Sequence, residues 1–242
     1  MNDNSGPASV ANPQHPHVAT VLLLDTSGSM ADSGKIGQLN EGLRLFKEKV
    51  SKDELACKRV ELAVVSFGDG VRVEHDFSSV EEFEPPTLDA NGNTPMGEAI
   101  LKAIEMVEKR KGEYKAKGVD YYRPWIFMIT DGEPTDMGPS GTLWITAKKN
   151  QNAAVSGAPK RLETHEVLWD EVVKMICDGN TEKTFRFMAL SVEPTNMNTL
   201  RQILPPDCQP VKLRRFRYSD LILHFEGDGE RSLDSSSQGE VV

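Results

Sequence analysis

The sequence predicts an α/β fold: a doubly wound, mostly parallel sheet with helices on both faces. Three observations support this class. The apolar run Val18–Leu24 is continuous rather than alternating and stops at Asp25, which is typical of a strand buried on both faces. Two more apolar runs, at 60–67 and 125–130, also lead into polar loops. Segments with apolar residues at helical spacing lie between these runs, and such alternation is typical of parallel sheets.

The first half of the chain contains two expected helices and a hairpin. Asp69-Gly70 is a hairpin signal between Val60–Phe67 and the alternating stretch Val71–Phe77, which predicts an antiparallel edge strand. Thr94 before Pro95 predicts a helix start with Thr94 as the N-cap. The apolar faces of the two helices consist of Ile36, Leu39, Leu43, Phe46 and Val50 in the first, and Met96, Ile100, Ala103, Ile104 and Val107 in the second.

The second half contains a long insertion at Met137–Thr184. A crossover between parallel strands needs only about a dozen residues, and this one is several times longer. Because it leaves the sheet at its polar end, we consider two interpretations, a rim over a bound ion and a mobile surface insertion. The expected elements from here on are a helix at Glu163–Cys177, a strand at Phe185–Val192, a helix at Asn196–Leu204, an edge strand at Val211–Phe216 and a helix at Tyr218–Phe225.

Composition predicts one domain with a tail at each end. Residues 17–226 carry the apolar patterns, whereas residues 1–16 are rich in Asn, Ser, Gly and Pro and residues 227–242 are acidic and rich in Ser. We expect both tails to be disordered. The three cysteines are widely spaced and include no C-x-x-C pair, so we expect reduced thiols rather than disulfides or a zinc site.

Charge and hydropathy exclude several classes of partner. The formal net charge of −9 argues against nucleic acid, whose phosphates call for a basic patch. No apolar stretch approaches membrane-spanning length, and the N-terminus lacks a signal-peptide pattern. The sequence therefore predicts a cytoplasmic protein with no membrane partner. Dinucleotide binding is disfavoured because no G-x-G-x-x-G follows the first strand.

Oxygen-bearing side chains gather at the predicted strand ends. Asp25, Ser27 and Ser29 follow the first strand at alternate positions of one tight loop, and Asp131 follows the strand that begins at 125. Thr94 lies in a third polar loop. Ligands of open parallel sheets bind beyond the carboxyl ends of the strands, and a set of oxygens alone suits a hard cation such as Mg²⁺. The sequence therefore predicts a metal site made of these residues.

This pattern resembles the metal-ion-dependent adhesion site (MIDAS) of von Willebrand factor type A (VWA) domains. That site consists of D-x-S-x-S, here at 25–29, then a separate Thr, here Thr94, and a separate Asp, here Asp131. D-x-S-x-S alone is a weak signal, because Asp and Ser after a strand often cap the next helix. The resemblance covers about 18–225, and the motifs DTSGSM, NTPMGEAI and ITDGEPTD are most similar to the small bacterial TerY-like and YegL-like members associated with tellurium resistance. The insertion departs from that group.

The resemblance implies a cytosolic protein-interaction module with a Rossmann-like VWA fold. Its metal would be Mg²⁺, with Mn²⁺ and Ca²⁺ as alternatives, and an open coordination position would accept an Asp or Glu carboxylate from a partner protein. The related group implies a tellurium-resistance or stress-response system, with kinase-like and phosphatase-like proteins as partners. Nothing in the sequence identifies the partner itself.

The residues favour recognition over catalysis. The three loops contain no His, and the first strand ends without the D-x-D pair of aspartate-nucleophile phosphatases. Ser27 and Ser29 lack a neighbouring base that would activate them as nucleophiles. The sequence therefore predicts a protein that is not an enzyme. Two alternatives stay open, a metal-dependent phosphatase or hydrolase and a structural domain with a vestigial metal site.

Overall fold

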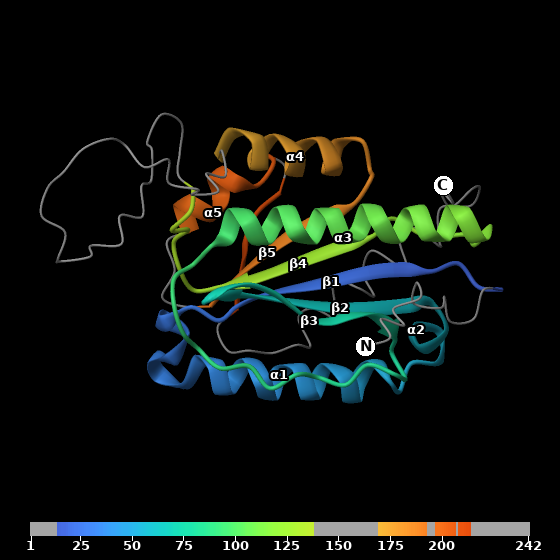
Figure 1. The fold of residues 1–242 in the computed structure, drawn as a ribbon, viewed down its shortest axis with the longest axis horizontal. Coiled ribbons are helices and arrows are strands. Elements are labelled where there is room, and N and C mark those ends of the chain that lie inside the picture. Colours follow the sequence, from blue (N-terminus) through green and yellow to red (C-terminus); the bar gives the residue numbers. More distant parts are fainter. Residues whose placement is uncertain (1–13, 138–168, 193–196, 207, 214–242) are drawn as a thin grey trace, which may run out of the picture.

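The computed structural model describes residues 14–137, 169–192, 197–206 and 208–213, and it has the predicted architecture (Figure 1). The 3₁₀ helix η1 follows the first strand, and two of the helices are short. The elements are β1 (Val18–Asp25), η1 (Gly28–Gly34), α1 (Lys35–Val50), α2 (Glu54–Arg59), β2 (Val60–Gly68), β3 (Gly70–Ser79), α3 (Met96–Lys117), β4 (Trp125–Thr130), α4 (Trp169–Thr181), β5 (Arg186–Val192), α5 (Met197–Ile203) and β6 (Val211–Leu213).

The described strands form one sheet in the order β3-β2-β1-β4-β5-β6. All neighbours are parallel except β2 and β3, which form the expected antiparallel hairpin through Asp69. β1 lies in the middle of the sheet. The next two strands, β2 and β3, lie on one side of β1, and β4, β5 and β6 lie on the other. This reversal of direction beside β1 defines a doubly wound sheet, so the predicted fold class is confirmed.

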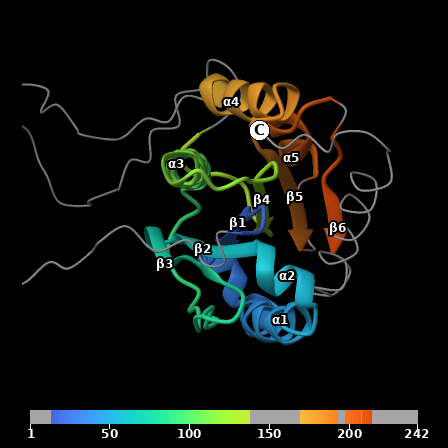
Figure 2. The ribbon, with the colours of Figure 1, turned by 90° about the vertical axis from the view of Figure 1, so that its right-hand side faces the viewer.

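Helices cover both faces of the sheet. Figure 2 shows α3, α4 and α5 on one face and α1 and α2 on the other. Alternate side chains of β1 enter the two cores: Val21 and Leu23 pack with the α3 and α4 side, and Leu22 and Leu24 pack with the α1 side. Burial on both faces explains why β1 is a continuous apolar run rather than an alternating one.

Most element predictions are confirmed, and some lie outside the described residues. The helix α4 extends to Thr181, four residues beyond its predicted end, while its predicted start at Glu163 is not described. The predicted tails, except for residues 14–16, are also outside, as are the helix at Tyr218–Phe225 and residues 138–168 of the insertion at Met137–Thr184. The unexpected short helix α2 begins at Glu54, and the carboxylate of the preceding Asp53 caps it. Across the described part of the chain, no helix has the length and apolar character needed to cross a membrane.

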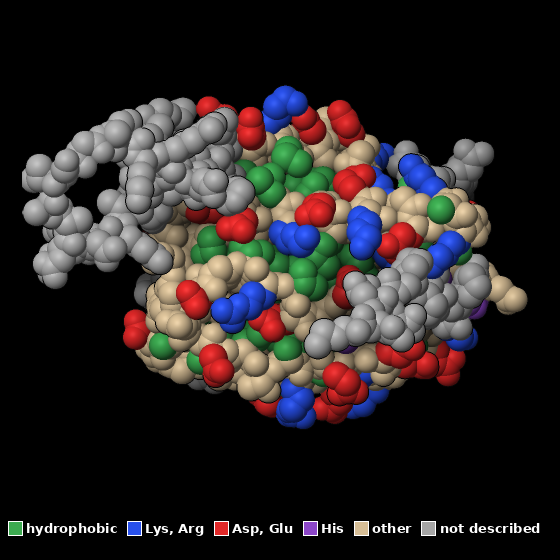
Figure 3. Space-filling view, viewed as in Figure 1, with side chains coloured by type: hydrophobic (Ala, Val, Ile, Leu, Met, Phe, Trp, Pro, Cys, Tyr) green, Lys and Arg blue, Asp and Glu red, His purple; other side chains and the backbone are tan. Residues whose placement is uncertain are grey.

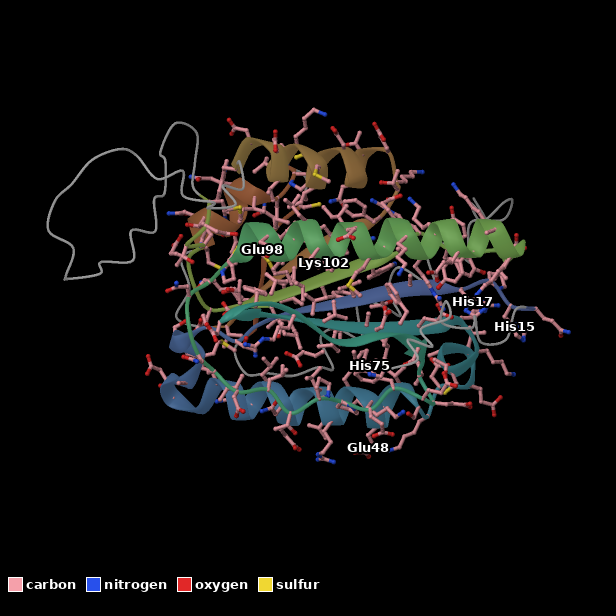
Figure 4. All side chains as sticks on the ribbon, viewed as in Figure 1. His15, His17, Glu48, His75, Glu98 and Lys102 are labelled. Carbon is pink, nitrogen blue, oxygen red and sulfur yellow. The ribbon has the colours of Figure 1, made fainter. Side chains whose placement is uncertain are left out.

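A buried charged cluster lies at the amino end of the strands. Glu61 of β2 is 1% exposed, and Arg110 and Tyr114 of α3 both donate hydrogen bonds to its Oε2 atom. The Arg110 Nε to Glu61 Oε2 distance is 2.7 Å. His17, which Figure 4 places at the opposite end of the sheet from Glu98, stacks on the Tyr114 ring. Burial and the Glu61 charge raise the pKa of Tyr114, so the phenol stays protonated and donates to the carboxylate.

The uncovered edge strand β3 forms one wall of a shallow groove. Its floor is apolar, as the hydrophobic side chains at the centre of Figure 3 show, and Glu98 and Lys102 of α3 lie at its border (Figure 4). Val73 of β3 is 42% exposed there. Charged residues interrupt this surface, which is consistent with an edge strand that must avoid pairing with other chains. The groove is lined by Val71, Val73, Glu98, Leu101, Lys102, Ile104, Glu105, Glu108 and Met175.

Candidate metal site

The predicted site residues gather at the carboxyl end of the two central strands. Asp25 is the last residue of β1, and Asp131 directly follows β4. The two strands are parallel neighbours with Leu24 opposite Ile129, so both carboxylates leave the sheet at the same level. This is the left-hand end of the sheet in Figure 1, where η1 and the first turn of α3 also lie.

Backbone hydrogen bonds join the three predicted loops. The amide of Asn91 donates to the carbonyl of Thr26 (2.7 Å), which ties the loop before α3 to the loop after β1. The amide of Thr135 donates to the carbonyl of Thr94 (2.9 Å), and the amide of Thr94 donates to the hydroxyl of Thr135 (3.0 Å). The loops after β1 and β4 are therefore held against the loop that carries Thr94.

Asp25 is the most deeply buried residue of the site. Its side chain is held by the backbone amide of Ser27, which donates to Oδ1 (2.8 Å), and by the hydroxyl of Thr130, which donates to Oδ2. Burial raises the pKa of the Asp25 carboxyl, and the nearby Asp131 charge adds to this rise, while the hydrogen bonds oppose it. A cation beside Asp25 would favour the ionised form.

Hydroxyl contacts link the loop after β1 to Asp131. The Oγ atoms of Ser27 and Ser29 lie 3.1 Å apart, and Ser29 Oγ donates to Asp131 Oδ1 (2.7 Å). Ser27 is buried, whereas Ser29 and Gly28 are exposed. The cluster therefore has a buried side at Asp25 and a side open to solvent at Ser29.

The space beside Gly132 shows that all three loops face one point. A methyl group added at Gly132 would lie 3.5 Å from Thr94 Oγ1, 3.7 Å from Asp25 Oδ2 and 3.7 Å from Ser29 Oγ. Asp25 and Ser29 lie at and just after the end of β1, Thr94 lies in the loop before α3, and Gly132 itself lies in the loop after β4. Gly132 leaves this space free because it has no side chain.

The donor set fits a hard divalent cation. It offers two carboxylates, whose charges formally balance +2, and neutral hydroxyl oxygens from Ser27, Ser29 and Thr94. Within the described residues no group of three or more His, Cys, Asp or Glu side chains is placed to hold a metal. A cation bound here would therefore depend on the hydroxyl oxygens as well as on Asp25 and Asp131.

Two members of the site were not anticipated from the sequence. Thr130 hydrogen-bonds Asp25 and accepts from the amide of Gly132 (3.1 Å). Lys35, just before the apolar stripe that begins at Ile36, is only 7% exposed and forms an ion pair with Asp131. The sequence signal for Thr130 is its place directly before Asp131. Lys35 follows the glycine that ends η1, and nothing in its local pattern marks it as buried.

The prediction that Thr94 caps the following helix is wrong. The helix α3 begins at Met96, its N-cap residue is Pro95, and no side chain from that position caps it. Instead the Asp136 carboxylate accepts from the amides of Gly97 (3.0 Å) and Glu98 (2.8 Å). Because Asp136 meets the orphan donors of the first turn, the hydroxyl of Thr94 is free to face the site.

Gly68, at the end of β2, has no room for a side chain. A Cβ there would lie 2.5 Å from the carbonyl oxygen of Thr26 and 2.6 Å from that of Asn91. We expect Gly68→Ala to lower the free energy of unfolding by about 1–3 kcal/mol, because the backbone must move to relieve the overlap. Denaturant unfolding measures this. Gly37→Ala, in open space on α1, is the control, and equal stability of the two variants would contradict the prediction.

A doubly wound domain whose central strands end in three polar loops belongs to the Rossmann-like class that binds ligands at this edge. Residues 20–133 match the model of the von Willebrand factor type A domain. The VWA domain that the motifs predicted is therefore confirmed for this stretch of the chain. No protein with curated annotation matches the sequence significantly.

Solved structures share the fold at low identity. The pilus adhesin SpaC from Lactobacillus rhamnosus GG is 15% identical with a TM-score of 0.56, over 89% of this chain and 30% of that one. The vWF domain of the type V pili tip protein Mfa5 from Porphyromonas gingivalis is 11% identical with a TM-score of 0.55, over 94% and 98%. The von Willebrand factor type A protein from Catenulispora acidiphila is 15% identical with a TM-score of 0.53, over 87% and 42%. The chain thus spans less than a third of the length of SpaC.

Proposed function

We propose that this protein is a divalent-cation-dependent recognition module whose cation is held by Asp25, Ser27, Ser29, Thr94 and Asp131. The observation that carries the proposal is the space beside Gly132, in the loop after β4, around which oxygens of Asp25 and Ser29, at and just after the end of β1, and of Thr94, in the loop before α3, converge. Such convergence is needed for a metal site and serves no purpose in capping a helix, which Asp136 does here.

Mg²⁺ is the cation that we propose, with Mn²⁺ and Ca²⁺ as alternatives. The oxygens are hard donors, and only two carry charge. Mg²⁺ keeps several waters when it binds to proteins, and the exposed side at Ser29 gives room for them. One of these positions can be exchanged for an oxygen of another molecule.

The exchanged ligand that we propose is an Asp or Glu carboxylate of a partner protein. A carboxylate is the side chain that combines negative charge with hard oxygens, and exposed amide and hydroxyl groups of the loop after β1 can donate hydrogen bonds to it. The motifs shared with TerY-like and YegL-like proteins suggest a cytoplasmic stress-response system linked to tellurium resistance, with kinase-like or phosphatase-like partners. SpaC, a pilus adhesin with the same fold, is consistent with a role in recognition.

Recognition is proposed in preference to catalysis because no described histidine contacts the cluster and both carboxylates are proposed as ligands of the cation. The described residues in contact with the cluster supply hydroxyls, carboxylates and the ammonium of Lys35, and none of the contacts involves a histidine. Release of phosphate from an aryl phosphate, lost in Asp25→Ala, would favour the metal-dependent phosphatase instead.

Titration of Mg²⁺ and Mn²⁺ into metal-stripped protein, followed by calorimetry, tests the proposal. We expect binding at one site in the wild type. Gly132→Ala keeps every oxygen but fills the space between them, and we expect it to weaken binding at least about tenfold, or about 1.4 kcal/mol. The added methyl meets its neighbours at ordinary contact distances, so the fold should persist.

Gly37→Ala is the matched control, since the same change lies in open space on α1 and should leave binding unchanged. Equal affinities of the wild type and Gly132→Ala would show that the cation lies elsewhere. Absence of binding in the wild type, even with acetate added as a carboxylate, would favour the vestigial site.

A further inference from the structure

A lysine ammonium lies inside the oxygen cluster of the candidate site. The side chain of Lys35 is 9% exposed, and its Nζ atom pairs with Asp131 Oδ2 and lies 3.3 Å from the carbonyl oxygen of Ser29. Asp131 Oδ1 accepts from the Ser29 hydroxyl, so the two oxygens of this carboxylate contact different neighbours. A metal that binds Asp131 must share the carboxylate with Lys35.

Without its ion pair with Asp131, the buried position of the Lys35 ammonium would be unfavourable. Lysine side chains are almost never buried unless they are paired. Lys35 is also the first residue of α1, and the partial positive charge of a helix N-terminus disfavours a cation there. Gly34, with a φ of 69°, makes the left-handed turn that starts the helix at Lys35. The Asp131 carboxylate is the group that offsets both costs.

The charges of the cluster show what Lys35 does to the site. When both carboxylates are ionised, Asp25 and Asp131 bring −2 and Lys35 brings +1, so these three side chains have a net charge of −1. Without Lys35, two buried carboxylates would face each other with no counter-ion in the metal-free state. With Lys35, a divalent cation meets both weaker attraction and the repulsion of a neighbouring ammonium.

We infer that Lys35 is a built-in counter-ion that stabilises the metal-free site and lowers its affinity for the metal. The inference rests on the proposed function, and it adds a reason why the metal-loaded site would attract an acidic partner. A divalent cation brings the cluster to +1, which leaves one positive charge for a carboxylate from outside to balance. Lys35 thus makes the loaded site attractive to an acidic partner, whereas a site without Lys35 would be neutral once loaded.

The test compares the wild type with Lys35→Met, which keeps an unbranched side chain one atom shorter than lysine and removes its charge. We expect the affinity for Mg²⁺, measured by calorimetry on the whole chain, to rise about tenfold or more. We expect the melting temperature of the metal-free protein to fall, because Asp131 loses its partner. The increase in melting temperature on adding Mg²⁺ should therefore be larger in Lys35→Met than in the wild type.

Two further variants separate charge from packing. Lys35→Arg keeps the positive charge and should bind Mg²⁺ with nearly the affinity of the wild type. Lys49→Met removes the same charge from an exposed position on α1, about 20 Å along the helix, where salt screens its effect on the site. We expect no change in Mg²⁺ affinity for this control. Lys35→Gln provides a second neutral side chain if Lys35→Met does not fold.

The outcomes are distinguishable. Tighter binding in the neutral variants, with lower metal-free stability, supports the inference, and so does folding of these variants only when Mg²⁺ is present. Binding in the wild type with equal or lower affinity in the neutral variants overturns the inference and leaves the proposed function in place. Neutral variants that do not fold even with Mg²⁺ also overturn it. If neither the wild type nor any variant binds Mg²⁺ or Mn²⁺, the proposed function fails and the inference with it.

Discussion

Replacing Glu61 with alanine is expected to lower the free energy of unfolding by about 3–5 kcal/mol, the range for removing one partner of a buried ion pair. Glu61 is 1% exposed and accepts hydrogen bonds from Arg110 and Tyr114, and Arg110 is itself only 2% exposed. Without Glu61, the guanidinium would keep the carboxylate of Glu113 but would lose its buried partner. A loss of this size is a large part of the stability of an ordinary domain.

Denaturant unfolding measures this loss, and two variants give its cause. Glu105→Ala removes the carboxylate that pairs with Lys102. The Glu105 side chain is 66% exposed, so we expect little change in stability. Glu61→Leu combined with Arg110→Met removes both buried charges and should recover part of the loss. A loss below about 1 kcal/mol for Glu61→Ala would contradict the prediction, because that is the level of an exposed pair.

The second large effect concerns the two carboxylates of the candidate site. We expect Asp25→Asn and Asp131→Asn each to weaken Mg²⁺ binding by at least about a hundredfold, or about 2.7 kcal/mol. Removing either charge leaves one carboxylate against the ammonium of Lys35, so the cluster no longer attracts a cation by its net charge. Calorimetric titration of the metal-stripped variants measures the change.

Asparagine is chosen so that the local structure persists. At position 25 the amide oxygen can still accept from Ser27, and the hydroxyl of Thr130, which has two lone pairs, can accept from the amide nitrogen. Asp32→Ala is the control, because it removes an exposed carboxylate from η1 close to the site. Folded asparagine variants that bind Mg²⁺ as tightly as the wild type would exclude Asp25 and Asp131 as ligands.

Much of the fold could be predicted because its signals are local. The continuous apolar run of β1, the Asp69-Gly70 turn and the helical stripe that begins at Ile36 each depend on residues a few positions apart. The alternation of these elements then restricts the sheet to very few arrangements, since crossovers between parallel strands have a fixed hand. The doubly wound sheet with an antiparallel edge follows from these features.

The sequence by itself predicted five residues of the candidate site but neither Thr130 nor Lys35, and the motif placed Asp25, Thr94 and Asp131 on three separate loops. That these residues hold a metal remains a prediction. Only the tertiary structure decided what surrounds them. It paired the ammonium of Lys35 with Asp131, and it made Asp136 rather than Thr94 the side chain that caps α3. It also placed Gly132 beside the oxygens of Thr94, Asp25 and Ser29.

These decisions share one physical reason. Lys35 is far from Asp131 in the chain, and Asp136 is far from the backbone amides of Gly97 and Glu98 that it accepts from. These contacts arise only when the loops pack together. Local propensity favours an exposed lysine on a helix and a threonine at a helix start. A buried carboxylate, however, must find a partner wherever the fold offers one, and this requirement outweighs the local preference.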